Sequence, residues 1–422
     1  MKKRWLVISY FGNIDAMAPS HHIDDRLPFL IEKGIDIDLI TSPCGAKFRN
    51  LSHIRVPSCA PSGIRYEVRH LLRRKSRKRF WFKFWETLLL LPVIPFYLLE
   101  KLFLRLDSTW SWFITSSVVA TVIGIKNRPE ILYSTGGPVS AHLSAMVASR
   151  ITGIPYIAEF QDPLVHQYAA PGKFERHIIE RVEKLIYRTA RGVVFLTKKA
   201  AENARERNKD ESKTFSIYAG AVPFSESVRY KKGETFSIAH FGSLGGSRNV
   251  DFFLRAWNAL LSEKPRRADY VFLDLYGSTP RSVARQREQS RHKQTIRIHG
   301  KVKRQSAVSF MHKADVLLLI QNTDDVSFET IPSKVYEYLH TGRPILSLTY
   351  RNPELQGLLE QMGHLIVQAD DEAGIKEGLE TYISRWEENR WHLPEGKSPY
   401  SVARAVDELI AVAEAASFRG TV

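Results

Sequence analysis

The sequence predicts an α/β protein of two domains, each with a parallel β-sheet covered by helices on both faces. Three observations carry this prediction. Short apolar segments alternate with helical patterns in the first half, the same alternation restarts after residue 215, and 422 residues suffice for two or three domains. Hydrophobic residues make up 44% and charged residues 25% of the chain, which is ordinary for a globular protein.

The first series of elements runs from the N-terminus to about residue 215. A helical pattern over Asp24–Lys33 is closed by Gly34, and a second helix is expected over about Val139–Thr152. The expected strands of this series are Trp5–Tyr10, Ile35–Thr41, Ile131–Ser134, Pro155–Ala158 and Val193–Leu196.

The second series has a helix over about Val250–Ser262, and Ala219–Thr235 is the expected linker before it. Ser398 suits an N-cap and Pro399 a first helical position, so a last helix is expected from Ser398 to about Ala416, packing back on the first domain. We therefore divide the chain into 1–218, 219–397 and 398–422. The expected strands of this series are Phe236–Phe241, Tyr270–Tyr276, Ile296–His299, Val316–Ile320 and Pro344–Leu348.

The net charge and the cysteines restrict the class of protein. With 61 Lys and Arg against 45 Asp and Glu, the net charge is +16, which favours nucleic acid, phosphorylated small molecules or an acidic membrane surface as partners. Cys44 and Cys59 are too few for a disulfide framework, which fits a reducing compartment. We read the N-terminal apolar run as a buried strand rather than a signal peptide, and no run reaches 18 apolar residues. A secreted mini-protein, a coiled coil and a multi-span transporter are excluded.

A basic and aromatic insertion is expected at about residues 68–113. Eight Lys and Arg lie between Arg69 and Lys83 with no acidic residue among them, and the apolar stretch Leu88–Leu99 follows. Basic residues meet anionic lipid head groups and aromatic rings enter the head-group boundary, so membrane contact is expected. A solvated charge run before a core helix and a single-stranded nucleic-acid site are the alternatives. The expected membrane contacts are Arg73, Arg74, Lys75, Arg77, Lys78, Arg79, Trp81 and Trp85.

The segment from Ser327 to Leu346 carries the clearest chemical pattern. Glu329 and Glu337 lie eight residues apart, and Pro332 followed by Ser333 and Lys334 is typical of a helix start. Free backbone N–H groups at such a start favour a phosphate, and the Lys334 ammonium adds a positive charge there. The Glu337 carboxylate, one turn further, can accept both hydroxyls of a ribose. An ordinary capped helix with a solvated carboxylate is the alternative.

This segment resembles the retaining glycosyltransferases of the GT-B type, in the large GT4-like family (glycosyl transferases group 1). The match is Glu329-x7-Glu337, and the Pro-Ser-Lys-x-x-Glu-Tyr-Leu version is similar to the subgroup that builds bacterial surface polysaccharides. The resemblance implies two Rossmann-like domains facing across a cleft. It also implies that Glu329 lies near the transferred sugar and Glu337 near the nucleotide ribose.

Further donor-site residues follow from the same resemblance. The glycine-rich turn after the strand Phe236–Phe241 lets a phosphate approach the backbone. In the family a basic pair follows the glycine; Arg248 fits the second position, whereas Ser243 stands where the first is usually Arg. The base is expected near His299–Val302, and ordinary tight turns are the alternative. The expected donor-binding residues are Gly242, Ser243, Arg248, Gly277, Gly300, Ser333, Lys334 and Glu337.

The N-terminal domain is expected to bind the acceptor. Strand ends are where open α/β sheets bind ligands, and Asp162 and His142 follow two of the expected strands. We take both, with Glu329, as catalytic candidates; a helix N-cap for Asp162 and a packed core histidine for His142 are the alternatives.

No metal site and no cofactor are expected. Asp36 and Asp38 form an Asp-x-Asp, but this pattern lies inside an expected strand rather than at a strand end. Basic side chains and helix dipoles can stabilise a departing nucleoside diphosphate without a metal.

The expected function is transfer of a sugar from a nucleotide sugar to a lipid-linked or growing glycan, with retention of configuration. The expected location is cytoplasmic, peripherally bound to the inner face of the membrane. Two rivals remain open, a nucleotide-sugar epimerase of the same architecture and a non-enzymatic membrane-associated assembly partner. Nucleic-acid binding is the least favoured partner class.

Overall fold

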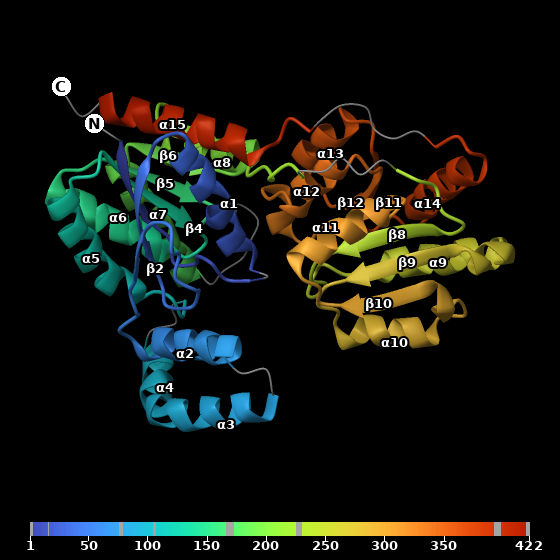
Figure 1. The fold of residues 1–422 in the computed structure, drawn as a ribbon, viewed down its shortest axis with the longest axis horizontal. Helices are drawn as coiled ribbons and strands as arrows, with labels where there is room; N and C mark the ends of the chain where they lie inside the picture. The colour runs from blue at the N-terminus through green and yellow to red at the C-terminus, as the bar shows by residue number, and fades with distance from the viewer. Residues whose placement is uncertain are drawn as a thin grey trace. The chain divides into compact units, whose positions relative to one another are not determined.

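The protein divides into two compact units, shown as ribbons in Figure 1. The computed structural model describes residues 3–15, 17–75, 79–103, 107–165, 173–224, 230–391 and 398–418. The described residues up to Val165, those from 173 to 218 and those from 402 to 418 form unit 1. The described residues between 219 and 401 form unit 2.

Unit 1 contains a seven-stranded parallel sheet in the order β3-β2-β1-β4-β5-β6-β7. The strand order reverses between β1 and β4, so the loops that follow these two strands diverge at the carboxyl edge of the sheet. The strands are β1 (Arg4–Ile8), β2 (Asp36–Thr41), β3 (Ser52–Arg55), β4 (Ile131–Gly136), β5 (Tyr156–Phe160), β6 (Gly192–Phe195) and β7 (Thr214–Ser216).

Helices pack on this sheet through buried apolar side chains. The first helix begins at Ala18, six residues before the expected start, because Pro19 occupies its first turn, where proline is well tolerated. These helices are α1 (Ala18–Glu32), α5 (Trp112–Asn127), α6 (Val139–Thr152), α7 (Lys173–Thr189), α8 (Lys198–Asn208) and α15 (Val402–Phe418).

The last helix, α15, starts later than predicted. Ser398 does not cap it: its hydroxyl accepts a hydrogen bond from the Tyr400 backbone at 3.2 Å, which closes a local turn. The Tyr400 carbonyl accepts from Ala221 N at 3.1 Å, and Ser401 forms a β-bridge with Ala221. This strand-like pairing holds the backbone extended, so the helix begins only at Val402 and packs against α1.

Unit 2 contains a six-stranded parallel sheet in the order β10-β9-β8-β11-β12-β13. With β8 as the first strand this is the order 3-2-1-4-5-6 of a Rossmann fold. The strands are β8 (Phe236–Phe241), β9 (Val271–Tyr276), β10 (Ile296–Gly300), β11 (Val316–Ile320), β12 (Ile345–Thr349) and β13 (Leu365–Gln368). The helices are α9 (Asp251–Glu263), α10 (Arg281–Gln289), α11 (Arg304–Lys313), α12 (Lys334–Thr341), α13 (Pro353–Glu360) and α14 (Glu372–Glu387). The predicted fold class, two Rossmann-like α/β domains, is confirmed.

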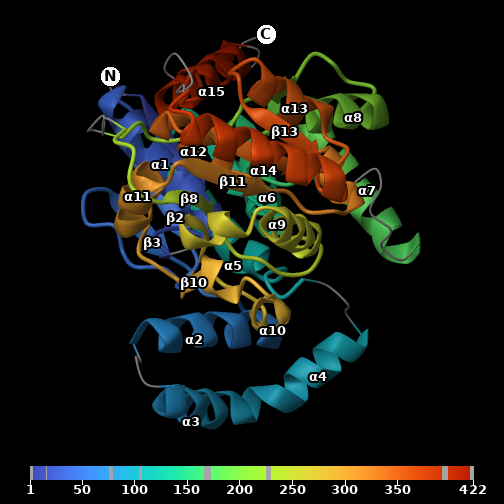
Figure 2. The same cartoon turned by 90° about the vertical axis from the view of Figure 1, so that its right-hand side faces the viewer.

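A group of helices in unit 1 stands away from its sheet (Figures 1 and 2). We call the described residues between 61 and 103 the helical arm. Its elements are α2 (Pro61–Lys75), α3 (Arg79–Leu90), the short 3-10 helix η1 (Leu91–Val93) and α4 (Ile94–Phe103). Figure 2 shows α3 and α4 following one another beneath α2. None of the helices in the described part of the chain is long and apolar enough to span a membrane.

Candidate functional site

The carboxyl ends of β8, β9 and β10 are joined by backbone hydrogen bonds. Gly242 N donates to Tyr276 O at 2.9 Å, and Gly277 N donates to Gly300 O at 2.7 Å. Gly277 has φ +130°, and a Cβ built on it would lie 1.9 Å from the Gly242 carbonyl oxygen, so only glycine fits there. Gly242, Gly277 and Gly300, expected in the donor site, therefore meet at one edge of the sheet.

The turn after β8 carries the next two expected residues. Ser243 is exposed, and two glycines with positive φ lead to a pair of backbone hydrogen bonds between Gly245 and Arg248, at 2.8 and 3.1 Å. The Arg248 guanidinium makes no hydrogen bond or ion pair with any described residue, and its Nε is buried. Burial lowers the pKa of Arg248, and the negative charge of Asp324 opposes this. A partly buried cation without a bonded carboxylate is suited to binding an anion.

The loop between β11 and α12 carries Glu329 and is held rigidly. The side-chain amide of Gln321 donates to the backbone oxygens of Ser327 and Thr330, at 2.8 and 3.0 Å. The amide of Asn352 donates to the same two oxygens, at 2.6 and 2.9 Å. Glu329 itself is 2% exposed. Two buried amides thus fix the backbone on both sides of Glu329.

Helix α12 holds Lys334 and Glu337 at the same edge of the sheet. The Tyr338 hydroxyl accepts from Phe241 N at 2.8 Å, which fastens the helix to the end of β8. Ser333 precedes the helix, and its hydroxyl makes no capping bond. Lys334 Nζ lies 2.5 Å from Glu337 Oε2, and the Arg304 guanidinium lies 3.3 Å from Glu337 Oε1. The two expected ligands of the nucleotide therefore pair with each other, next to a third charge that the sequence did not single out.

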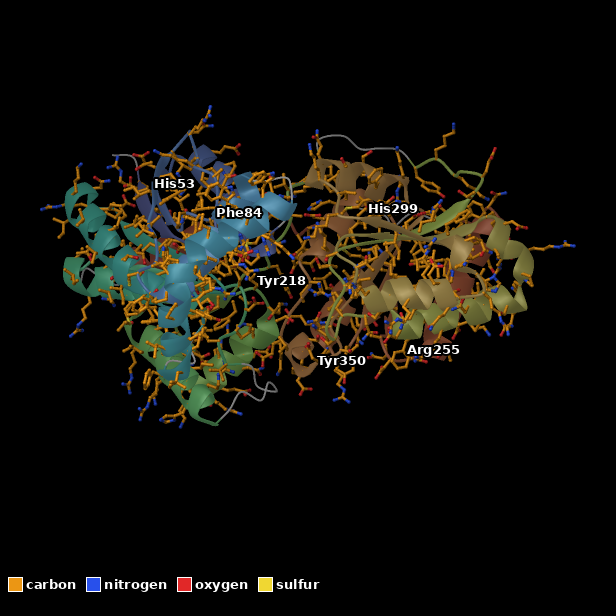
Figure 3. The ribbon with its side chains drawn as sticks, turned by 90° about the horizontal axis from the view of Figure 1, so that it is seen from below. His53, Phe84, Tyr218, Arg255, His299 and Tyr350 are labelled. Carbon is orange, nitrogen blue, oxygen red and sulfur yellow. The ribbon has the colours of Figure 1, made fainter. Side chains whose placement is uncertain are left out.

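The expected base region lies at the end of β10. His299 Nε2 is 2.6 Å from Asp274 Oδ1, and its ring stacks on that of Tyr276 with centroids 4.2 Å apart. Figure 3 labels His299 in this part of unit 2. The carboxylate fixes the ring plane, so a flat aromatic surface stands at the strand end.

The two acceptor-side candidates have different environments in unit 1. Asp162 is exposed, and its carboxylate lies near the turn at Gly137, where a Cβ would be 3.6 Å from Oδ2. His142 is 0% exposed; its Nδ1 lies 3.0 Å from the Ser134 hydroxyl and its ring packs on Phe160. Burial lowers the pKa of His142 to about 4. This placement favours the packed core histidine over a group that meets substrate.

A buried charge network at the end of β5 was not predicted from the sequence. Glu159 is fully buried; Arg26, Tyr133 and His22 donate hydrogen bonds to its carboxylate, the last at 2.9 Å. Burial alone would raise the pKa of Glu159, but the Arg26 charge and these bonds hold it well below its usual range. One signal was present: Glu159 interrupts an apolar strand, and Arg26 lies on the apolar face of its helix.

The helical arm carries its polar contacts inside and its apolar side chains outside. Glu100 on α4 accepts from Ser62 and Trp110 at 2.5 to 2.8 Å, and Arg69 pairs with Glu86 at 2.6 Å. These bonds join α2, α3 and α4. The large apolar side chains that are exposed on the arm are Trp81, Phe84, Trp85, Leu88, Leu89, Leu91, Ile94, Phe96, Leu98, Leu99, Leu102 and Phe103. Large apolar side chains exposed in this number on one segment are typical of a place of contact with another molecule or a membrane.

The expected membrane contacts fall into three groups. Arg73 is exposed on α2, and Trp81 and Trp85 are about half exposed on α3, where Figure 3 also labels Phe84. Arg74, Lys75 and Arg79 lie in helices, but their side chains are outside the description. Arg77 and Lys78 lie outside the described residues.

Comparison with known proteins connects both units to described families. Residues 32–220 match the family model described as Glycosyl transferase 4-like domain. Residues 235–385 match the one described as Glycosyl transferases group 1. No curated protein sequence matches the chain.

Several solved structures are similar to the whole chain. HepE from Anabaena in complex with UDP is 12% identical, with a TM-score of 0.60 and 98% of each chain covered. Sucrose-phosphate synthase from Thermosynechococcus elongatus is 11% identical, with a TM-score of 0.61, and the match covers 99% of this chain and 97% of that one. A protein described as a UDP-N-acetylglucosamine 2-epimerase from Listeria monocytogenes is 12% identical, with a TM-score of 0.52 and 97% and 96% covered. At these identities the likeness shows the fold alone, a GT-B fold with two Rossmann-like domains.

Proposed function

The chain is a glycosyltransferase of the GT-B type, and from this premise we propose that it transfers a sugar from a nucleotide sugar to a lipid-linked or growing glycan. The observation that carries the proposal is the group of charges at the end of β8 in unit 2. Lys334, Glu337 and the unbonded Arg248 guanidinium are brought to one edge of a Rossmann-type sheet. That edge is where such sheets bind nucleotides.

The proposed roles follow from the charge and position of each residue. Arg248 and Lys334 hold the diphosphate, because cations and a helix start stabilise the negative charge that develops as the nucleoside diphosphate leaves. The Glu337 carboxylate takes the ribose hydroxyls, and Glu329 lies at the donor sugar. These two cations make a bound metal unnecessary for the departure of the diphosphate. Retention of configuration is proposed on the likeness of the glutamate pair to that of retaining enzymes.

The proposed place of action is the cytoplasmic face of the membrane. The exposed apolar surface of the arm and the Lys and Arg residues of the insertion support it. The cytoplasmic leaflet is rich in anionic lipid, and each basic residue near it contributes about 1 kcal/mol. A lipid-linked acceptor in that leaflet would then be held close to the enzyme. Asp162 is the proposed acceptor-side group of unit 1.

The test is transfer of radiolabelled sugar to extracted bacterial lipids. Purified protein is incubated with a panel of nucleotide sugars, beginning with UDP-sugars, in a buffer containing EDTA. We expect radiolabelled sugar to appear in the lipid phase with one of the donors. Glu329→Gln should lower the rate of this transfer at least about 100-fold, as for other groups that act on the transition state. Glu360→Gln, an exposed glutamate on α13, is the matched control.

Two results would refute the proposal. Donor consumption without any acceptor, with an isomeric nucleotide sugar as product, would show an epimerase. Vesicle binding without any nucleotide binding would show a non-enzymatic membrane partner.

A further inference from the structure

A buried histidine on β8 has one ring nitrogen that nothing in the described residues uses. His240 is 4% exposed, and its Nδ1 lies 2.9 Å from the Leu318 carbonyl oxygen on the neighbouring strand β11. Its Nε2 is buried and has no hydrogen-bond partner among the residues that the structure describes. The ring thus bridges β8 and β11, the two strands between which the strand order reverses.

The hydrogen bond from Nδ1 to Leu318 determines whether the Nε2 nitrogen can donate or accept. A carbonyl oxygen only accepts, so Nδ1 must carry the proton and donate. Burial, together with the positive charges of Arg248 and Lys334, lowers the pKa of His240 to about 4 although the bond to Leu318 opposes this, so the ring is neutral near pH 7. In this tautomer Nε2 has a lone pair and no proton. It can only accept, and a fully ionised phosphate oxygen cannot bond to it.

The free nitrogen points to the glycine turn of the proposed donor site. A Cβ built on Gly242 would lie 3.2 Å from His240 Nε2 and 3.6 Å from Cε1. Apart from the residues next to Gly242 in the chain, no other described atom lies within 4 Å of that position. Because residue 242 is a glycine, it places no side chain of its own over Nε2. The positive charges of Arg248 and Lys334 act on His240, so two cations suited to a diphosphate lie near one neutral acceptor suited to a hydroxyl.

We propose that His240 Nε2 accepts a hydrogen bond from a hydroxyl group of the sugar that the nucleotide donor carries. The assignment rests on the proposed function, because it places the sugar next to the diphosphate held by Arg248 and Lys334. The ribose is the other source of hydroxyls, but Glu337 is proposed to take it. His240 is bonded to β11, the strand that leads into the loop of Glu329, the residue proposed to face the same sugar. His240 would therefore help the enzyme to prefer the nucleotide sugar over the nucleoside diphosphate.

Two substitutions of His240 test the roles of its two ring nitrogens separately. His240→Asn keeps an amide near the position of Nδ1, which can still donate to the Leu318 carbonyl, and removes the Nε2 acceptor. His240→Gln can place an amide oxygen near the position of Nε2 and so keeps the acceptor. His364→Asn is the matched control, because His364 is also a buried histidine of unit 2 with an unpartnered Nε2. His364 directly precedes β13, and its Nδ1 accepts a hydrogen bond from the backbone N–H of Ile345 at the start of β12.

The experiment is calorimetric titration of each protein with a nucleoside diphosphate and with the matching nucleotide sugar. The pairs are UDP with UDP-glucose, GDP with GDP-mannose and ADP with ADP-glucose. For the pair that binds wild-type protein, His240→Asn is expected to weaken the nucleotide sugar about three- to tenfold, the effect of one hydrogen bond. Its affinity for the diphosphate should stay within about twofold, and His240→Gln and His364→Asn should keep the wild-type preference.

The remaining outcomes overturn the proposal in distinguishable ways. Equal weakening of both ligands by His240→Asn would assign the nitrogen to the ribose or to the turn itself. An unchanged preference in His240→Asn would remove His240 from the sugar site. If His240→Asn does not fold, a lost preference in folded His240→Gln, which keeps the acceptor, overturns the proposal. Failure of every nucleotide to bind wild-type protein would instead refute the proposed function, whatever the variants do.

Discussion

The two most exposed apolar side chains of the helical arm give a direct test of membrane contact. Leu102 and Phe103 are 71% and 78% exposed at the end of α4. We expect Leu102→Ser/Phe103→Ser to weaken binding to vesicles of phosphatidylcholine and phosphatidylglycerol. Because both side chains are already in solvent, the double variant should unfold at nearly the same temperature as wild-type protein.

The size of the effect follows from the exposed fractions. Burying a whole Leu or Phe side chain contributes about 1.5–3 kcal/mol, and about three quarters of each side chain is available here. The two losses together are therefore about 2.3–4.5 kcal/mol, or roughly 40-fold to more than 1,000-fold in the partition coefficient. The assay is cosedimentation with vesicles over a range of lipid concentrations.

A matched control lies on another helix of the same unit. Val118 and Val122 on α5 are 63% and 58% exposed and lie outside the arm. Val118→Ser/Val122→Ser removes a comparable apolar surface and should leave vesicle binding unchanged. Equal losses in the two double variants, or no loss in the arm variant, would refute the assignment of the arm as the membrane contact.

Three further predictions concern the stability of the two units. Glu159→Gln leaves the buried charge of Arg26 without its counter-ion and should lower the free energy of unfolding by about 3–5 kcal/mol, measured by urea denaturation; a loss below about 1 kcal/mol would contradict the network. Asn352→Leu removes one of the two amides that donate to the backbone oxygens of Ser327 and Thr330, and it should lower the free energy of unfolding by about 1–3 kcal/mol. An unchanged unfolding midpoint would show that the amide of Gln321 suffices. Burial lowers the pKa values of His142 and His364 to about 4, so the unfolded chain binds more protons than the folded one below about pH 6.5. The contribution of these histidines to stability is therefore full above that pH, and the free energy of unfolding should fall by about 2 kcal/mol per histidine on going to about pH 5. A free energy of unfolding that does not change over this pH range would contradict their burial.

The strands at the centre of each sheet could be predicted because they are almost wholly apolar. Val316–Ile320 is buried at every position, and its predicted bounds are the observed ones. The strands that were not predicted are short and lie at or near sheet edges. In β3 only His53 is buried, and β13 has no fully buried residue, so neither shows the pattern that marks a central strand.

The residues of the donor site could be predicted where local sequence determines local geometry. The helix start after Pro332 and its end at Gly342, with φ +65°, follow from backbone preferences of single residues. The pairing of Glu159 with Arg26 joins residues 133 positions apart, and no local pattern contains it. The same applies to the start of α15, which depends on the pairing of Ser401 with Ala221.

The proposed function requires that unit 2 binds a nucleotide through Glu337. The most direct measurement is the affinity of wild-type protein and Glu337→Ala for a panel of nucleoside diphosphates, by calorimetry in the presence of EDTA, with Glu360→Ala as control. We predict that one base type binds wild-type protein and the control equally, and that Glu337→Ala binds it at least about tenfold more weakly, as expected when a charged hydrogen-bond partner is lost. Unchanged affinity in Glu337→Ala, or no binding of any nucleotide to wild-type protein, would contradict it.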